Sequence, residues 1–126
     1  MAPYRIEIDA HQGLVTTTYF GVVTTECIEN ATREYLEHPH FDASFRALVD
    51  LTAVTRAEMH TDDVTKVGLE SPYAPGSWLA LVASDDVTYG LARAFEMTVE
   101  SRGRNVRVFR DRAEADAWLT SAEEHR

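Results

Sequence analysis

The chain has 126 residues, of which 44% are hydrophobic and 26% are charged, and its formal net charge is −9. This length and composition are typical of a globular protein, and we expect one domain over residues 1–126. The acidic excess argues against partners rich in phosphate, so we predict no nucleic-acid binding. The longest uninterrupted apolar run, residues 78–83, is too short to span a bilayer, so we predict no membrane insertion.

The number of cysteines and the first residues of the sequence bear on the cellular compartment that we expect. Cys27 is the one cysteine of the sequence, which excludes an internal disulfide and any Cys-x-x-Cys motif. The first residues lack the apolar run of a signal peptide. These features favour a cytoplasmic protein. The glycines are scattered and form no phosphate-binding loop, so we expect no cofactor. Without a Cys-x-x-Cys pair, and with His38 and His40 separated by a proline that keeps them off one helix face, we expect no metal site.

The sequence opens with a predicted hairpin. Alternating apolar and polar residues predict a strand over 4–8. The β-branched and aromatic run at 14–20 predicts a second strand, which ends at Gly21. Turn-forming residues at 9–13 join the two strands, so we expect them to be antiparallel.

A helix, a strand and a weaker helix follow. Thr24 or Thr25 can cap the first helix, which Pro39 stops. The apolar run at 45–51 predicts the third strand. Thr61 resembles an N-cap and is followed by two acidic residues, which predicts a second helix there.

The strongest signals lie in the second half. Residues 78–83 include no polar side chain, which is typical of a central parallel strand covered on both faces. A helix is predicted after it, capped within 84–86 and ending near Arg102. Its expected inward stripe consists of Val87, Leu91, Ala94, Phe95 and Thr98.

The chain ends with a predicted edge strand and a last helix. The edge strand covers 106–110, where arginines alternate with apolar residues. Asp111 and Glu114 form a capping-box pattern that opens the helix, and we expect the chain to fray from Thr120. The order β-β-α-β-α-β-α-β-α predicts an α/β fold: a mixed five-stranded sheet with an N-terminal antiparallel hairpin and packed helices.

This order resembles the STAS domain, the fold of the anti-sigma-factor antagonist SpoIIAA. Residues 80–96 (ALVASDDVTYGLARAFE) and 106–119 (VRVFRDRAEADAWL) are similar to the bacterial SpoIIAA-like group, also described as STAS/CRAL-TRIO-like. The resemblance implies a STAS-like fold and a non-enzymatic regulatory or protein-interaction role. The chain offers no nucleophile–base pair or metal motif, so we expect no enzyme and no catalytic residue.

The resemblance also singles out a candidate switch. STAS antagonists carry a phosphorylatable serine in an Asp-Ser-Ser-Gly type motif, at the start of the helix after the third strand. Here the sequence reads His60, Thr61, Asp62. Thr61 takes the place of the first serine, but the glycine is missing, which implies that the phospho-serine switch is not intact. These three residues are candidate switch or docking residues, and a plain helix cap at Thr61 is the competing interpretation.

A second candidate site lies at the predicted strand ends. Ligands bind at the carboxyl ends of strands in open α/β sheets, and carboxylates there can hold a cation or act as acid and base. Helix capping is the competing interpretation. The candidate residues are Asp50, Ser84, Asp85, Asp86, Tyr89 and Arg93.

The CRAL-TRIO-like label implies an alternative function, a carrier of a small apolar ligand or lipid. In a carrier the helices part from the sheet to enclose the ligand. The candidate lining residues are Met59, Trp78, Tyr89 and Phe95.

Two surface features predict the partner. Five basic residues fall within 102–112 against one acid, which predicts a basic margin or a solvated sheet edge. Tyr73, Tyr89 and Met97 do not fit the predicted inward stripes and can form an exposed apolar surface, which would mark a homodimer contact or a ligand mouth. We therefore expect another protein, or a second copy in a homodimer, as the partner.

Overall fold

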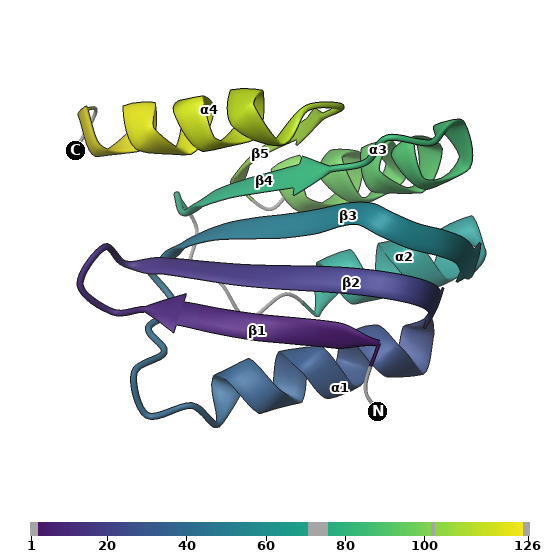
Figure 1. Ribbon diagram of the computed structural model, residues 1–126, viewed down its shortest axis with the longest axis horizontal. Coiled ribbons are helices and arrows are strands. Elements are labelled where there is room, and N and C mark those ends of the chain that lie inside the picture. Colours follow the sequence, from purple (N-terminus) through teal and green to yellow (C-terminus); the bar gives the residue numbers. More distant parts are fainter. Residues whose placement is uncertain (1–2, 71–75, 102, 125–126) are drawn as a thin grey trace.

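The computed structural model describes residues 3–70, 76–101 and 103–124. In this part of the chain a five-stranded sheet is flanked by four helices (Figure 1). The strands are β1 (Tyr4–Asp9), β2 (Leu14–Thr24), β3 (Arg46–Glu58), β4 (Trp78–Val82) and β5 (Asn105–Phe109). The helices are α1 (Thr25–Leu36), α2 (Thr61–Leu69), α3 (Asp86–Glu100) and α4 (Arg112–Glu124). None of these helices is long and apolar enough to cross a membrane.

The sheet is mixed, as predicted, and its strands lie side by side in chain order, β1 to β5. β1 and β2 are antiparallel, and the other neighbouring pairs are parallel. β4 is nearly fully buried between β3 and β5, and β5 forms an edge, which confirms both predictions from the apolar run and the arginine alternation.

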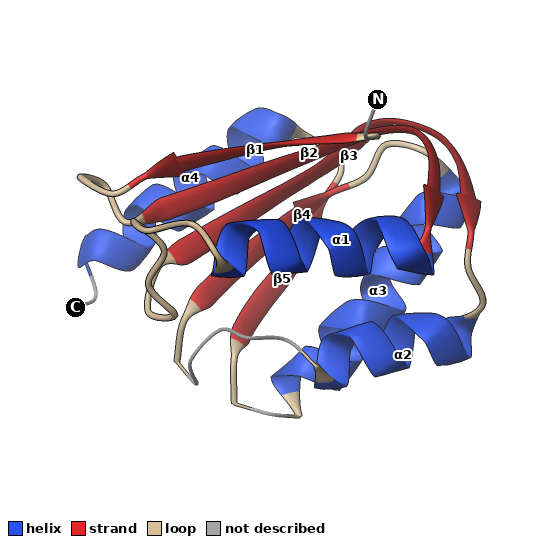
Figure 2. Cartoon of the chain, turned by 90° about the horizontal axis from the view of Figure 1, so that it is seen from below, coloured by secondary structure: helices blue, strands red, loops and turns tan. Residues whose placement is uncertain are grey.

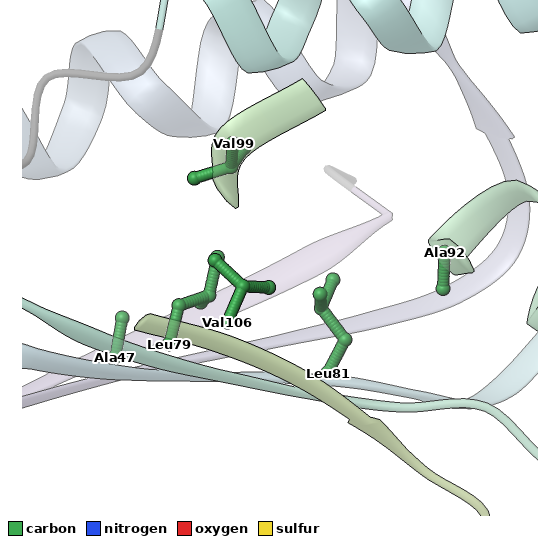
Figure 3. Packing of buried hydrophobic residues seen from close by; sticks show 6 residues of the cluster. All are labelled: Ala47, Leu79, Leu81, Ala92, Val99 and Val106. Atoms are coloured by element: carbon green, nitrogen blue, oxygen red, sulfur yellow. The ribbon is translucent and has the colours of Figure 1, made fainter. Parts of the chain in front are cut away.

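The helices form a layer on each side of the sheet. α1, α2 and α3 lie on one side and α4 on the other (Figure 2). Because side chains alternate along a strand, Leu79 and Leu81 of β4 face α3, whereas Ala80 and Val82 face α4. Figure 3 shows Leu79 and Leu81 pointing toward Val99 and Ala92 of α3. The sheet thus separates two cores.

β2 and β3 are longer than predicted. Gly21 does not end β2: it adopts a positive φ of 70° inside a strand that continues to Thr24. The register with β3 shifts between Thr18 and Phe20 and again between Gly21 and Val22. Such shifts bend a strand pair without ending it, and Figure 2 shows β2 and β3 curling toward the helices at their carboxyl ends. An isolated glycine marks a bulge as readily as a strand end, which is why the prediction was wrong.

The buried face of α3 also differs from the prediction. The predicted stripe began at Val87, which is 69% exposed. The buried residues are Thr88, Ala92, Glu96 and Val99, one position further along. A buried glutamate in the middle of this face breaks the apolar pattern on which the prediction depended.

Side-chain hydrogen bonds cap the starts of three helices. Thr24, Asp85 and Asp111 each accept a hydrogen bond from a main-chain amide in the first turn of α1, α3 and α4. The expected fraying from Thr120 is wrong, because α4 continues to Glu124 and Ala122 is buried against the core.

α2 packs closely against α3 at Gly68. A Cβ atom at this position would lie 3.0 Å from Cγ2 of Thr98 and 3.3 Å from Cγ2 of Val99. The missing side chain therefore sets how closely these two helices approach.

Candidate functional site

The structure places Asp50 at the predicted strand end and gives it fixed partners. Asp50 on β3 is the register partner of Val82, the last residue of β4. One carboxylate oxygen accepts bonds from the amide and hydroxyl of Thr52, at 2.9 and 2.7 Å, and the other accepts from Arg112 at 2.9 Å. Burial raises the pKa of the Asp50 carboxyl, but the Thr52 hydrogen bonds and Arg112 outweigh it and hold this pKa below its usual value.

The carboxylates that follow β4 are also engaged. Asp85 caps α3 by accepting from the amide of Thr88 at 2.9 Å. Hydrogen bonds from the amide and the hydroxyl of Thr88 lower the pKa of Asp85. Asp86 pairs with Arg110 at 2.9 Å, and the Arg110 guanidinium lies 4.1 Å from the ring centre of Tyr89. Ser84 is exposed, and its carbonyl accepts from Arg110 at 3.1 Å.

Arg93, the last residue of this candidate site, pairs with Glu96 one turn further along α3. The six predicted residues therefore lie at one end of the sheet and on α3, but the charged side chains among them bond to separate partners. No group of three or more histidine, cysteine, aspartate or glutamate side chains in the described ranges is placed to hold a metal ion.

The predicted basic margin is largely neutralised. Arg104 is 5% exposed and so adds little to the surface. Arg110 and Arg112 form ion pairs with acidic side chains, which leaves Arg107 exposed on β5. Arg102 lies outside the described residues, as does Tyr73 of the predicted apolar surface. Local charge counts along the sequence missed these cross-element pairs.

The candidate switch lies at the start of α2. His60 is the N-cap residue, and Thr61 is the first residue of the helix, so the assignment of Thr61 as the cap was wrong by one position. The His60 amide donates to the carboxylate of Asp63 at 3.0 Å. His60, Thr61 and Asp62 are exposed.

A cavity of about 220 Å³ lies between the sheet and helices α1, α2 and α3. Its walls are mostly apolar, with Val49 and Leu81 on the sheet side and Ile28, Val64 and Phe95 on the helix side. Small side chains create the space: Thr17, Ala47, Ala57 and Ala92 all line it. The curled ends of β2 and β3 contribute Val23, Val54 and Ala57.

Several polar residues also line this mostly apolar cavity. Thr17 and Tyr19 of β2 line the cavity and are 5% and 6% exposed. Arg104 also lines it, and its Nε donates to Oγ of Ser77 at 2.7 Å. Thr32, Tyr35 and Thr88 line the cavity as well. Glu29 and Glu70 also line it and are exposed, so the cavity reaches the surface beside carboxylates.

The chain aligns with a solved structure over nearly its whole length. That structure is of an uncharacterized protein of the DUF3478 family with a SpoIIAA-like fold, from Shewanella loihica PV-4. The two sequences are 20% identical, the TM-score is 0.59, and the alignment covers 92% of this chain and 91% of the other. The fold is SpoIIAA-like. No family model and no curated protein matches the sequence.

The SpoIIAA-like fold confirms the resemblance stated from the element order and the two C-terminal motifs. The structure of this chain also tests the residues predicted to line a ligand cavity. Met59 and Phe95 line the cavity, as expected for a carrier. Trp78 lies in the core cluster with α4 and stacks on Trp118 at 4.6 Å between ring centres. Tyr89 contacts Arg110 and is not among the lining residues.

Sequence reasoning missed the polar lining of this cavity. Thr17 and Tyr19 were read as ordinary strand residues. Their spacing of two places them on one face of β2, and that face is the one α1 covers. Arg104 immediately precedes an edge strand and was counted as a surface charge.

Proposed function

We propose that this protein binds a small apolar molecule in the cavity between the sheet and helices α1, α2 and α3. The observation that supports the proposal is the cavity itself, about 220 Å³ in volume and walled mainly by apolar side chains. An apolar protein cavity of about 150 Å³ is large enough to bind benzene.

Burial of an apolar ligand favours binding. Removing apolar surface from water contributes about 25 cal/mol per Å², and most of the cavity wall is apolar.

A cavity-filling pair of variants tests the proposal. Ala92→Leu places a larger side chain in the cavity wall, whereas Ala94→Leu changes the same helix outside the lining. We expect calorimetry with ethylbenzene to show saturable binding to the unmodified protein and to Ala94→Leu, and at least tenfold weaker binding to Ala92→Leu. Absence of binding to the unmodified protein contradicts the proposal, as does equal binding to both variants.

A docking function at the start of α2 is the second candidate. The exposure of Thr61 beside a helix N-terminus supports it, because a phosphate there meets free amides and the positive end of the helix dipole. A switch at this position predicts that Thr61→Glu changes which proteins copurify with the chain, and an unchanged set contradicts it. A homodimer, a cytoplasmic location and a lack of enzymatic activity stay predictions from the sequence.

A further inference from the structure

We infer that the ligand of this cavity is an uncharged molecule with an apolar body and one hydrogen-bonding oxygen, which the hydroxyl groups of Thr17 and Tyr19 bind. The inference rests on the proposed function and names the chemical class of the ligand. Its basis is the pair of hydroxyl groups that two buried residues of β2 contribute to the cavity wall.

Thr17 and Tyr19 are buried as residues, at 5% and 6% exposed, and both line the cavity. Within the described part of the chain, neither hydroxyl forms a hydrogen bond to another protein group. Neither hydroxyl oxygen is fully enclosed by protein. A molecule in the cavity can therefore bond to both groups, and polar groups at such positions are almost always hydrogen-bonded.

The two side chains present their hydroxyl groups from the same strand face. They are two residues apart on β2, so both lie on the side of the sheet that α1 covers. Tyr19 is held there by Cys27 and Ala31 of α1 and by Val54 of β3. Most of the remaining wall is apolar, which suits the apolar body of the ligand.

The phenol of Tyr19 is a donor throughout the physiological range. Burial raises the pKa of Tyr19 far above its usual value, and the neighbouring Tyr35 adds to this effect. A neutral carbonyl, ether or alcohol oxygen accepts from such a donor. Each hydroxyl oxygen can also accept from a ligand alcohol.

The charges around the cavity disfavour an anionic ligand. Two carboxylates, Glu29 and Glu70, stand where the lining reaches the surface. The arginine of the lining, Arg104, precedes β5, whereas Thr17 lies three strands away on β2. An anion held at the hydroxyl pair would therefore be separated from this cation by the width of those strands. A neutral head group avoids the cost of burying an unpaired charge.

Three aromatic probes of similar size test the inference: acetophenone is neutral with one carbonyl, ethylbenzene is apolar, and benzoate is anionic. We expect calorimetry to show acetophenone binding about fivefold more tightly than ethylbenzene, the effect of one hydrogen bond, and benzoate binding weakest. Thr17→Val and Tyr19→Phe each remove one hydroxyl and keep most of the shape. Each should reduce the preference for acetophenone over ethylbenzene.

The possible outcomes separate the two proposals. If ethylbenzene binds as tightly as acetophenone, or benzoate binds most tightly, the inference is wrong and apolar binding stands. If no probe binds, the proposed function fails. The order of the three probe affinities on the unmodified protein tests the inference even if neither variant folds. Tyr19→Phe should also keep the ligand-free stability of the parent, because the hydroxyl it removes has no protein partner.

Discussion

The side-chain carboxylate of Glu96 accepts a hydrogen bond from the main-chain amide of Val108, with 3.2 Å between the two atoms. Glu96 is 5% exposed in the middle of α3, and Val108 lies on the edge strand β5. The other oxygen of this carboxylate accepts from Arg93. The helix thereby covers a strand edge that would otherwise present an unpaired amide.

Removing this carboxylate should destabilise the protein. We expect Glu96→Ala to lower the free energy of unfolding by about 1–3 kcal/mol, because it leaves the half-buried Val108 amide without its acceptor. Glu96→Gln keeps an acceptor oxygen and should lose less. Urea unfolding can be followed by the fluorescence of Trp78 and Trp118, which stack on the opposite side of the sheet.

Glu100→Ala is the matched control for this prediction. Glu100 lies one turn further along α3 and is exposed, so its substitution should change stability by less than about 0.5 kcal/mol. Equal losses for Glu96→Ala and Glu100→Ala would mean that the edge contact contributes nothing.

Asp50 should make stability depend on pH. Its pKa in the folded protein lies below the usual value, so the ionised form favours folding. This contribution is complete above the unfolded-state value of about 3.9 and disappears as the pH falls through the lower folded-state pKa. We therefore expect Asp50→Asn to be less stable than the parent at pH 7. The difference should shrink toward zero in strong acid when urea unfolding is repeated across this range.

Asp116→Asn is the control, because Asp116 pairs with the same Arg112 at 3.4 Å on the surface. Exposed pairs contribute about 0–1 kcal/mol, so this variant should follow the parent at every pH. A deficit in Asp50→Asn that stays constant from pH 7 into strong acid would contradict the assignment of the pH dependence to this carboxyl.

The close approach of α2 and α3 predicts that a side chain at position 68 destabilises the protein. Gly68→Val should cost about 1–3 kcal/mol more than Gly90→Val, because overpacking forces helices apart. Gly90 lies on α3, and a Cβ atom there meets nothing within 4 Å. Both substitutions introduce the same β-branched residue into a helix, so the difference between their unfolding free energies isolates the crowding. Equal costs would show that the two helices separate freely.

Much of the fold could be predicted because its signals are local. The apolar run of β4 indicated a strand buried on both faces, and capping residues located the starts of α1, α3 and α4. The inward stripe of α3 could not be predicted, because Glu96 is buried by its bond to an amide on another strand. Likewise, Gly21 carries no local mark that separates a bulge from a strand end.

The candidate sites were harder to predict than the elements. The register of β3 and β4 placed Asp50 near the end of β4 as expected, but the partner Arg112 comes from a helix far along the chain. The cavity has no motif at all, because it arises from small side chains on separate elements that the fold brings together. Of its lining, sequence reasoning found Met59 and Phe95 through the family resemblance.

The central claim, an apolar ligand on one side of the sheet, is tested most directly by methyl NMR during titration with ethylbenzene. Leu79 and Leu81 line the cavity, whereas Leu48 and Leu119 belong to the core that faces α4. We predict saturable shifts for the methyl groups of the first pair and none for the second. No shifts at saturating probe, or equal shifts on both sides of the sheet, would contradict the account.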